Sequence, residues 1–238
     1  MSSIKNYEKL IESIPVRNHS VIVRKENWIK NDSLHTRLTK NNQFQNNNDD
    51  LLNTLQTIFE NAQNGKIEIS REDIFKEKDF EKKLIMVLLW GYPTGGRGNN
   101  IANILNERKQ FIQKLNDTLK DKKNSITQDD YKKLNTKGEN KKEWLGLSTM
   151  SKILYFFEVK IDKNPCLIFD SQIILSLQKN NIDEFKNVDW KRTDEKYFEY
   201  LEIVNMISKE KLKNSKIKPE AIELFLFHFN MHFQLEKK

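Results

Sequence analysis

Residues 144–175 read WLGLSTMSKILYFFEVKIDKNPCLIFDSQIIL, the most apolar stretch of the 238-residue chain. Two charged residues interrupt it. Lys152 lies within a run whose apolar residues recur with helical spacing, and Asp170 directly follows the apolar residues 167–169. The spacing predicts a helix over 147–159 with one core stripe. The stripe consists of Met150, Ile153, Leu154 and Phe157.

Each charged residue has a structural and a chemical interpretation. Lys152 shares its helix face with Ser148, Tyr155 and Val159, so its ammonium either reaches water along the aromatic side chains or is partly desolvated. Partial desolvation favours the neutral amine, which is a nucleophile. Asp170 is suited to cap a helix that begins after it, because its carboxylate accepts N–H bonds from the first turn.

Composition limits the classes of function. Lys+Arg total 41 against 34 Asp+Glu, which gives a net charge of +7 and fits a polyanionic partner, although a lysine-rich coding bias would give the same surplus. The single cysteine, Cys166, excludes an intramolecular disulfide and a cysteine-based metal site. His228 and His232 are four residues apart but lack a third ligand, so we expect no metal and no cofactor.

Helical periodicity dominates the rest of the chain, so we predict an all-α fold with at most a minor strand near 18–30. Residues 40–50 are polar and predict a loop, with Asp49 and Asp50 capping the next helix. Helices are expected over 4–14, 51–63, 71–90, from Gly98 to about 115, near 127–135, and over 193–213 and 219–235.

Four of the seven glycines fall in LWGYPTGGRGNN, at Gly91, Gly95, Gly96 and Gly98. Glycine loses the most backbone entropy on folding, so such a cluster indicates unusual dihedral angles or the close approach of another backbone. The loop leads into a helix, whose free N–H groups together with Arg97 could hold a phosphate. A tight turn between two helices is the alternative.

Lys152 and Asp170 together resemble the catalytic region of the helix-hairpin-helix DNA glycosylases, in which a helix-borne lysine precedes a helix-capping aspartate. SKILYFF…LIFDSQI is similar to the divergent 8-oxoguanine glycosylase branch labelled OGG-like, where WGYPxGGRG also recurs. The resemblance covers residues 80–180. It implies two helical lobes with a cleft between them, formed by the whole of 1–238. Residues 50–180 would form the catalytic core, and the N-terminal segment and C-terminal helices the second lobe.

The resemblance implies a DNA glycosylase that flips out a modified base, such as oxidised guanine, and cleaves its bond by lysine Schiff-base chemistry, with a possible AP-lyase step. Lys152 takes the place of the nucleophile and Asp170 that of the essential carboxylate. The expected substrate-binding residues are Trp90, Gly91, Tyr92, Tyr155 and Gln172. The residues expected to bind DNA phosphates are Gly95, Gly96, Arg97, Gly98 and Ser148.

Three features depart from the family pattern. The hairpin reads WLGLSTMSK, with one glycine and two extra residues before Lys152. Gln172 stands where many relatives carry arginine, and no four-cysteine iron–sulfur motif follows. Two other functions therefore stay open: a non-catalytic binder or sensor of modified DNA, with Lys152 and Asp170 far apart or facing solvent, and an all-α interaction module.

We expect a cytoplasmic monomer that acts on double-stranded DNA and does not bind membranes. The N-terminal segment is charged and amphipathic rather than a signal peptide, and no apolar run reaches the ~18 residues needed to span a bilayer. The resemblance implies repair of oxidised guanine in a bacterial or archaeal cell. Removal of modified bases from phage DNA is the alternative biological role, and no residue decides between the two.

Overall fold

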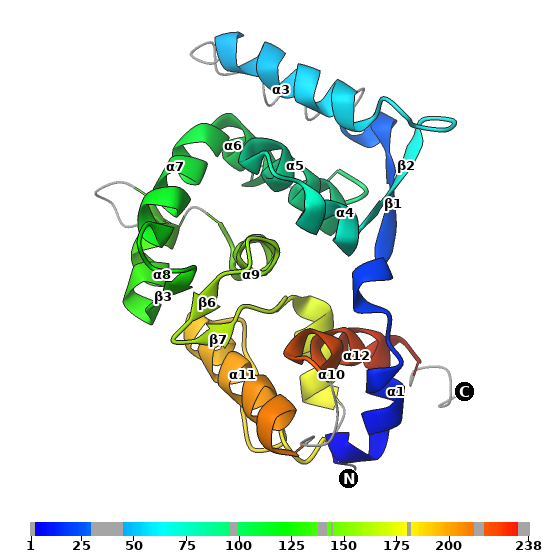
Figure 1. The fold of residues 1–238 in the computed structure, drawn as a ribbon, viewed down its shortest axis with the longest axis vertical. Coiled ribbons are helices and arrows are strands. Elements are labelled where there is room, and N and C mark those ends of the chain that lie inside the picture. The colour runs from blue at the N-terminus through cyan, green and yellow to red at the C-terminus, as the bar shows by residue number, and fades with distance from the viewer. Residues whose placement is uncertain are drawn as a thin grey trace. The chain divides into compact units, whose positions relative to one another are not determined.

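The computed structural model describes residues 3–29, 45–95, 100–137, 142–143, 145–179, 182–211 and 217–232. Within these ranges the fold is mostly helical, as the sequence predicts, but the expectation of at most a minor strand was wrong, because seven strands form three small sheets (Figure 1). The helices are α1 (Glu8–Glu12), α3 (Gln45–Ile58), α4 (Arg71–Lys76), α5 (Phe80–Gly91), α6 (Asn100–Asn106), α7 (Arg108–Leu119), α8 (Gln128–Asn135), α9 (Leu147–Phe156), α10 (Ser171–Lys179), α11 (Asp194–Met206) and α12 (Pro219–His232). The strands are β1 (Ser20–Arg24), β2 (Lys66–Ser70), β3 (Ser125–Ile126), β4 (Thr136–Lys137), β5 (Lys142–Glu143), β6 (Lys160–Ile161) and β7 (Asn164–Pro165).

Contacts group the chain into two compact units. Unit 1 contains Met1–Val16, Asp121–Asn135 and Gly146–Lys238, and unit 2 contains Arg17–Lys120 and Thr136–Leu145. Both units are therefore built from separated segments of the chain. The expected division into a catalytic core over residues 50–180 and a second lobe made of the N-terminal segment and the C-terminal helices stays a prediction.

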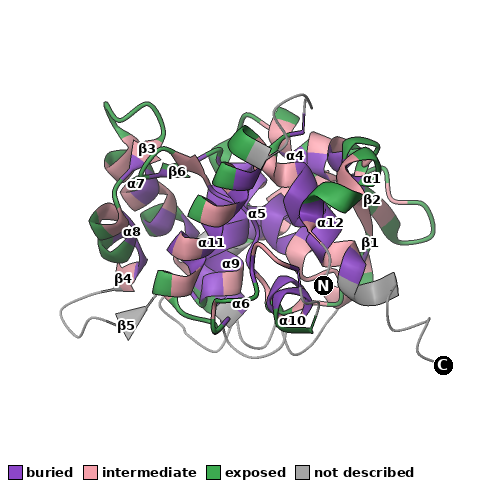
Figure 2. Cartoon of the chain, turned by 90° about the horizontal axis from the view of Figure 1, so that it is seen from below, coloured by how far each residue is buried: buried purple, intermediate pink, exposed green. Residues whose placement is uncertain are grey.

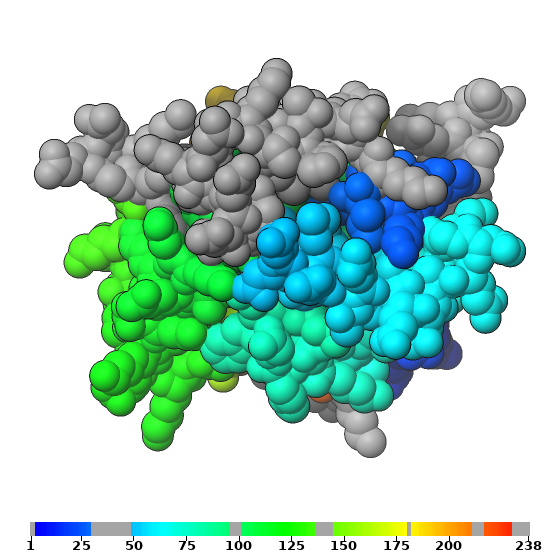
Figure 3. Space-filling model, turned by 90° about the horizontal axis from the view of Figure 1, so that it is seen from above, coloured from blue at the N-terminus to red at the C-terminus, as the bar shows by residue number. Residues whose placement is uncertain are grey.

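Unit 2 is built around α5, which contacts the strands β1 and β2 and the helices α3, α4 and α7. β1 and β2 pair antiparallel, from Ser20 opposite Ser70 to Arg24 opposite Lys66. The segment 18–30 was expected to hold a possible strand, and β1 confirms it. Figure 3 shows the side chains of α3 and β2 lying next to each other on one face of this unit.

The sequence prediction missed β2 and joined two helices into one. Asn64 and Gly65 both have positive φ, of 50° and 71°, and form the turn that precedes β2. The helix expected over 71–90 is in fact α4 and α5. Ser70 caps α4 in a capping box with Asp73, and Asp79 caps α5 by accepting the N–H of Lys82 at 2.7 Å.

The prediction of a loop over 40–50 was wrong from residue 45 onward, because α3 begins at Gln45. Asp50 therefore lies inside the helix and does not cap it. Its carboxylate instead accepts from the Lys109 ammonium at 2.6 Å and lies 3.7 Å from the Arg108 guanidinium. Hydrogen bonding to Lys109 holds the pKa of Asp50 below its usual value. The Asp50 carboxylate therefore pairs with cations of α7 instead of capping the start of a helix.

In unit 1 the helix α12 packs on α10 and on α1 (Figure 1). The helix expected over 193–213 ends as α11 at Met206 and continues as a single π-turn, Ile207–Lys211. The helix expected over 219–235 begins at Pro219, as predicted, and residues beyond His232 lie outside the described part of the chain. A short helix near 127–135 was also expected, and α8 confirms it.

The central helix of the opening stretch, α9, ends three residues earlier than expected. Phe157 is its C-cap, and the next residue, Glu158, has a φ of 55°. The N–H of Glu158 bonds to Tyr155 O and that of Val159 to Leu154 O, both at 3.0 Å. This is a Schellman motif with glutamate at the position that usually carries glycine. The chain then turns back through the β6–β7 hairpin.

Every residue of α9 except Ser148 is buried, so the helix has no solvent-facing side. Figure 2 shows α9 among the most completely buried elements, together with α5 and α12. A helix that is apolar on all sides is a core helix. The one-sided stripe predicted from sequence is buried as expected, and the face that carries Lys152 is buried as well.

Candidate active site

Lys152 is a buried lysine near the middle of α9, and only 7% of its side chain is exposed. Its ammonium donates to Ser148 Oγ at 3.1 Å, to Ser148 O at 3.4 Å and to Asp170 Oδ2 at 3.1 Å. An ammonium has three N–H donors, so these three acceptors satisfy it. Residues i and i+4 of a helix are neighbours, which explains why Ser148 can reach Lys152.

Asp170 has a different task for each of its two oxygens. Oδ1 accepts the N–H groups of Gln172 at 3.0 Å and Ile173 at 3.3 Å, which caps α10 as the sequence predicts. Oδ2 accepts from the Lys152 ammonium. The side chain is 15% exposed, so the pair lies at the edge of the core. The structure therefore brings together the two residues on which the sequence argument depends.

The stretch that carries Asp170 is anchored by one backbone hydrogen bond and by aromatic side chains from α11 and Trp190. Residues 166–170 belong to no helix or strand. The N–H of Cys166 donates to Val159 O at 2.9 Å, and Tyr197 OH donates to Leu167 O at 3.1 Å. The ring of Phe169 packs against Tyr197, Tyr200 and Trp190, with centroids 5.0 to 6.3 Å away.

One residue at the site was missed from the sequence. Ser151 Oγ accepts the N–H of Phe169 at 3.1 Å and donates to Ser148 O at 3.3 Å, and the residue is fully buried. A serine inside an apolar helix gives a signal in the sequence only by being polar where its neighbours are not. Its partner 18 residues away is a backbone amide, which no pattern of side chains reveals.

Two groups in or beside this segment, the Cys166 thiol and the Tyr197 hydroxyl, are protonated at neutral pH. Burial raises the pKa of the Cys166 thiol to about 12, so this cysteine does not supply a thiolate nucleophile. Burial also raises the pKa of Tyr197 well above its ordinary value. Lys152 is therefore the nitrogen nucleophile with an adjacent carboxylate in this segment, and the arrangement suits attack by an amine assisted by a base.

The two remaining residues expected to bind substrate in unit 1 lie near the pair along the chain. Tyr155 is one turn after Lys152 in α9, is 4% exposed, and donates through its hydroxyl to Glu220 Oε2 at 3.4 Å. Its ring meets Phe156 edge-on. Gln172 lies in the first turn of α10 and is half-buried. Their roles toward a substrate stay predictions.

The glycine loop belongs to unit 2, so its expected cleft with Lys152 also stays a prediction. Trp90 is buried in α5 with its ring edge-on to His19, Gly91 ends the helix, and the N–H of Tyr92 donates to Leu88 O. Gly95 has a φ of 84°, and a Cβ there would lie 2.6 Å from Asn27 O. Gly95 therefore has both an unusual dihedral angle and a close backbone neighbour, the two features that a cluster of glycines indicates.

The Gly95 N–H donates to Tyr92 O at 2.8 Å, which supports the interpretation as a tight turn at this residue. Three more residues of the loop were expected to contact phosphate. Gly96, Arg97 and Gly98 lie outside the described residues. Ser148, also expected to contact phosphate, lies in unit 1, where its hydroxyl faces Lys152.

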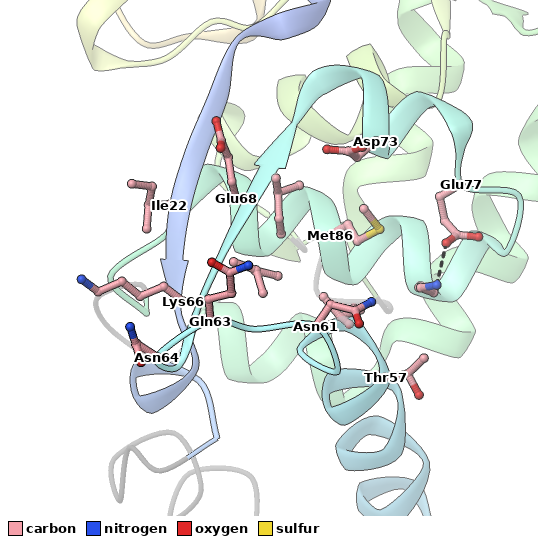
Figure 4. Close-up of a pocket in the computed structure, with 14 residues that line it drawn as sticks. Ile22, Thr57, Asn61, Gln63, Asn64, Lys66, Glu68, Asp73, Glu77 and Met86 are labelled. Atoms are coloured by element: carbon pink, nitrogen blue, oxygen red, sulfur yellow. Dashed lines mark ion pairs between the residues drawn. The ribbon is translucent and has the colours of Figure 1, made fainter.

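Unit 2 also contains a hollow of about 740 Å³. It lies between the end of α3, the antiparallel pair of strands β1 and β2, α4 and α5, and Met86 contributes to its lining (Figure 4). Its acidic residues already have partners within the unit: Glu68 accepts from the Ser20 hydroxyl, Asp73 accepts from the N–H and hydroxyl of Ser70, and Glu77 pairs with Lys82 at 3.0 Å. None of the expected site residues lines it.

No group of three or more His, Cys, Asp or Glu side chains in the described part of the chain is placed to hold a metal ion. His228 is half-buried beside Phe227, and the side chain of His232 is not described. Among the described helices, none combines the length and apolar character required to cross a bilayer.

A buried lysine held against a helix-capping aspartate in a mostly helical fold is the arrangement expected from the resemblance to lysine-bearing DNA glycosylases. The comparison of the sequence with family models leads to the same class. Residues 14–227 match the family described as "Putative 8-oxoguanine DNA glycosylase OGG-like protein", and the chain belongs to this family. Neither a curated protein nor a solved structure matched the chain. Membership implies a DNA glycosylase as the class of enzyme and DNA as the substrate.

Proposed function

We propose that this protein is a DNA glycosylase that excises a modified base, with oxidised guanine as the expected substrate. Lys152 is the nucleophile and Asp170 is the carboxylate that assists it. The observation that carries the proposal is the distance of 3.1 Å between Lys152 Nζ and Asp170 Oδ2, in a chain that belongs to a glycosylase family. The non-catalytic hypothesis requires these groups to be apart or solvent-facing, and their contact argues against it.

The chemistry begins with base flipping, which costs a few kcal/mol of stacking and pairing. Trp90, Gly91 and Tyr92 are the residues proposed to receive the base. The ammonium of Lys152 passes one proton to Asp170, and the neutral amine attacks C1′ of the sugar. The N–C1′ bond forms as the C1′–base bond breaks, and the base leaves with that electron pair and takes the proton held by Asp170. The carboxylate restored in this way stabilises the positive charge that develops on the sugar.

After the base has left, the nitrogen loses a proton and the bond from C1′ to the ring oxygen opens. The product is a Schiff base between Lys152 and the sugar. Loss of a proton from C2′ then expels the 3′ phosphate, which is the AP-lyase step. Arg97 and the lysines of 120–142 are proposed to contact DNA phosphates, so affinity should fall steeply as salt concentration rises.

Borohydride trapping tests the nucleophile. Duplexes carrying 8-oxoguanine and a panel of other modified bases are incubated with the protein, and a reduced covalent adduct is expected with at least one of them. Lys152→Gln should abolish the adduct. Lys83→Gln is the matched control, because Lys83 is similarly buried but lies in unit 2 over the ring of Phe75. An adduct that persists in Lys152→Gln would refute the assignment.

A second variant separates catalysis from binding. Asp170→Asn keeps an oxygen that can cap α10 but removes the charge next to the amine. We expect DNA affinity to be retained and base excision to be lost. Wild-type protein that binds modified duplexes tightly, forms no adduct and releases no base would instead support a non-catalytic sensor.

A further inference from the structure

The separation between the Lys152 amine and the Asp170 carboxylate depends on how two parts of the chain are joined. Lys152 is held by α9, whereas Asp170 ends a stretch, 166–170, with no regular backbone pairing. The first turn of α10 fixes the orientation of the carboxylate through Oδ1. It does not fix how far the carboxylate lies from α9, so another contact must set that distance.

Ser151 provides the contact closest to the pair. It precedes Lys152 in α9, and its hydroxyl accepts the N–H of Phe169, the residue that precedes Asp170, at 3.1 Å. The bond therefore joins the immediate neighbours of the two reacting groups. It is fully buried, since Ser151 and Phe169 are both 0% exposed. A buried amide without its acceptor is costly, so the bond favours one position of the 166–170 stretch strongly.

The same hydroxyl is connected to the ammonium through Ser148. Ser151 Oγ donates to Ser148 O at 3.3 Å, and the Lys152 ammonium donates to this carbonyl at 3.4 Å. The direction of the Ser151 O–H bond is therefore set by an acceptor that also binds the amine. The aromatic packing of Phe169 holds the other side of the stretch and does not touch α9 through any of these ring contacts.

We propose that Ser151 is a positioning residue that sets the distance between the Lys152 amine and the Asp170 carboxylate. The inference rests on the proposed function, because it assigns the contact a role in glycosidic cleavage. Ser151 itself does not touch the reacting atoms. Reaction rates depend steeply on placement, and an error of about 1 Å can cost about 100-fold in rate. A loss of rate without a loss of DNA binding is therefore the expected signature.

The test compares Ser151→Ala with Ser151→Thr and Ser176→Ala. Threonine keeps the hydroxyl and can bond the i−3 carbonyl of a helix, so it should rescue the function. Ser176 in α10 is also fully buried, which makes its alanine variant a control for the loss of a buried hydroxyl. Ser151→Cys keeps nearly the same volume with a weak donor and acceptor, and replaces Ser151→Ala if the alanine variant does not fold.

Three quantities are measured for each variant: hydrogen exchange of the Phe169 amide, the DNA dissociation constant at fixed salt, and the single-turnover rate of base release from the duplex that the wild type cleaves. In Ser151→Ala we expect faster exchange, an unchanged dissociation constant and a rate reduced by about 10- to 100-fold. Ser151→Thr should recover most of the rate, and Ser176→Ala should leave rate and Phe169 exchange unchanged.

The outcomes distinguish this inference from the proposed function. A wild type that cleaves DNA, together with a Ser151→Ala variant that cleaves at the same rate, overturns the positioning role and leaves the glycosylase proposal intact. Equal losses of rate in Ser151→Ala and Ser176→Ala overturn it too, because a general loss of core packing would then explain both. A wild type that releases no base from any duplex overturns the proposed function and the inference with it.

Discussion

Replacing Asp170 by alanine should destabilise the protein far more than the loss of a surface ion pair, because Asp170 has two separate structural tasks. The Lys152 side chain is 7% exposed and the Asp170 side chain 15%, so the pair is close to the buried limit. Removing one partner of a buried ion pair costs about 3–5 kcal/mol, whereas exposed pairs contribute about 0–1 kcal/mol. Ser148 O and Oγ still accept from the stranded ammonium, which places the cost near the lower end, about 3 kcal/mol.

The cap adds to this cost. Asp170 Oδ1 accepts two N–H groups at the start of α10, and replacing such a residue by alanine costs about 1 kcal/mol. Asp170→Ala should therefore lower the free energy of unfolding by about 4 kcal/mol. Asp170→Asn retains a capping oxygen and should lose about 1 kcal/mol less. Combining Asp170→Asn with Lys152→Met removes the unpaired charge, so the double variant should be more stable than the sum of the single changes predicts.

Urea unfolding followed by circular dichroism measures the wild type, Asp170→Ala, Asp170→Asn, Lys152→Met and the double variant at neutral pH, and the slopes of the five transitions should agree. A cost for Asp170→Ala below about 1 kcal/mol would refute the buried pair, since that value is typical of exposed ions. Strict additivity in the double variant would refute the coupling between the two side chains. Equal costs for alanine and asparagine would refute the capping bond to Oδ1.

Two further predictions follow from particular backbone and electrostatic features. Glu158→Gly should stabilise the protein by about 1 kcal/mol in urea unfolding. Glu158 has a φ of 55° at the end of α9, and glycine lacks the Cβ that is strained in this conformation. A loss of stability would show that the glutamate side chain contributes more than the strain costs. Burial raises the pKa of Asp194, so the folded state binds the carboxyl proton more tightly than the unfolded state does. This carboxyl therefore contributes stability at low pH, and the contribution is lost as pH rises through the folded-state pKa. Asp194→Asn should therefore gain stability relative to the wild type as pH increases from about 4 to 7, and a constant difference in Tm over that range would contradict the shift.

The sequence indicated the contact between Lys152 and Asp170 but misplaced several helix boundaries, and the roles of the site residues stay predictions. Each charged residue stood out in an apolar stretch, and the aspartate had a local reason to cap a helix, but the pairing of Lys152 with Asp170 came from the resemblance to the glycosylase family. The same rule failed at Asp50, which looks equally suited to capping but bonds to Lys109 and Arg108 on α7. Capping preferences are local, so they mislead where a tertiary partner is stronger.

Other features had a signal in the sequence that helical periodicity obscured. β2 follows Asn64-Gly65, a turn sequence typical of hairpins, and its apolar residues alternate, but the long apolar run that follows favoured helix. The role of Ser151 could not be predicted at all, because its partner is the backbone amide of Phe169. A prediction of side-chain chemistry can reach the two reacting groups, but not the backbone contact that sets their distance.

The division of labour within Asp170 explains why one residue can serve both folding and chemistry. The capping bonds to Oδ1 fix the carboxylate plane relative to α10, and this leaves Oδ2 facing the Lys152 ammonium. Because the carboxylate is already ordered by the helix that it caps, little of the entropy cost of its orientation falls on the reaction step. A preorganised carboxylate also needs no rearrangement as charge develops on the sugar. A helix start beside a buried amine thus gives one carboxylate both a capping role and a position next to the Lys152 ammonium, although the preceding hairpin has only one glycine.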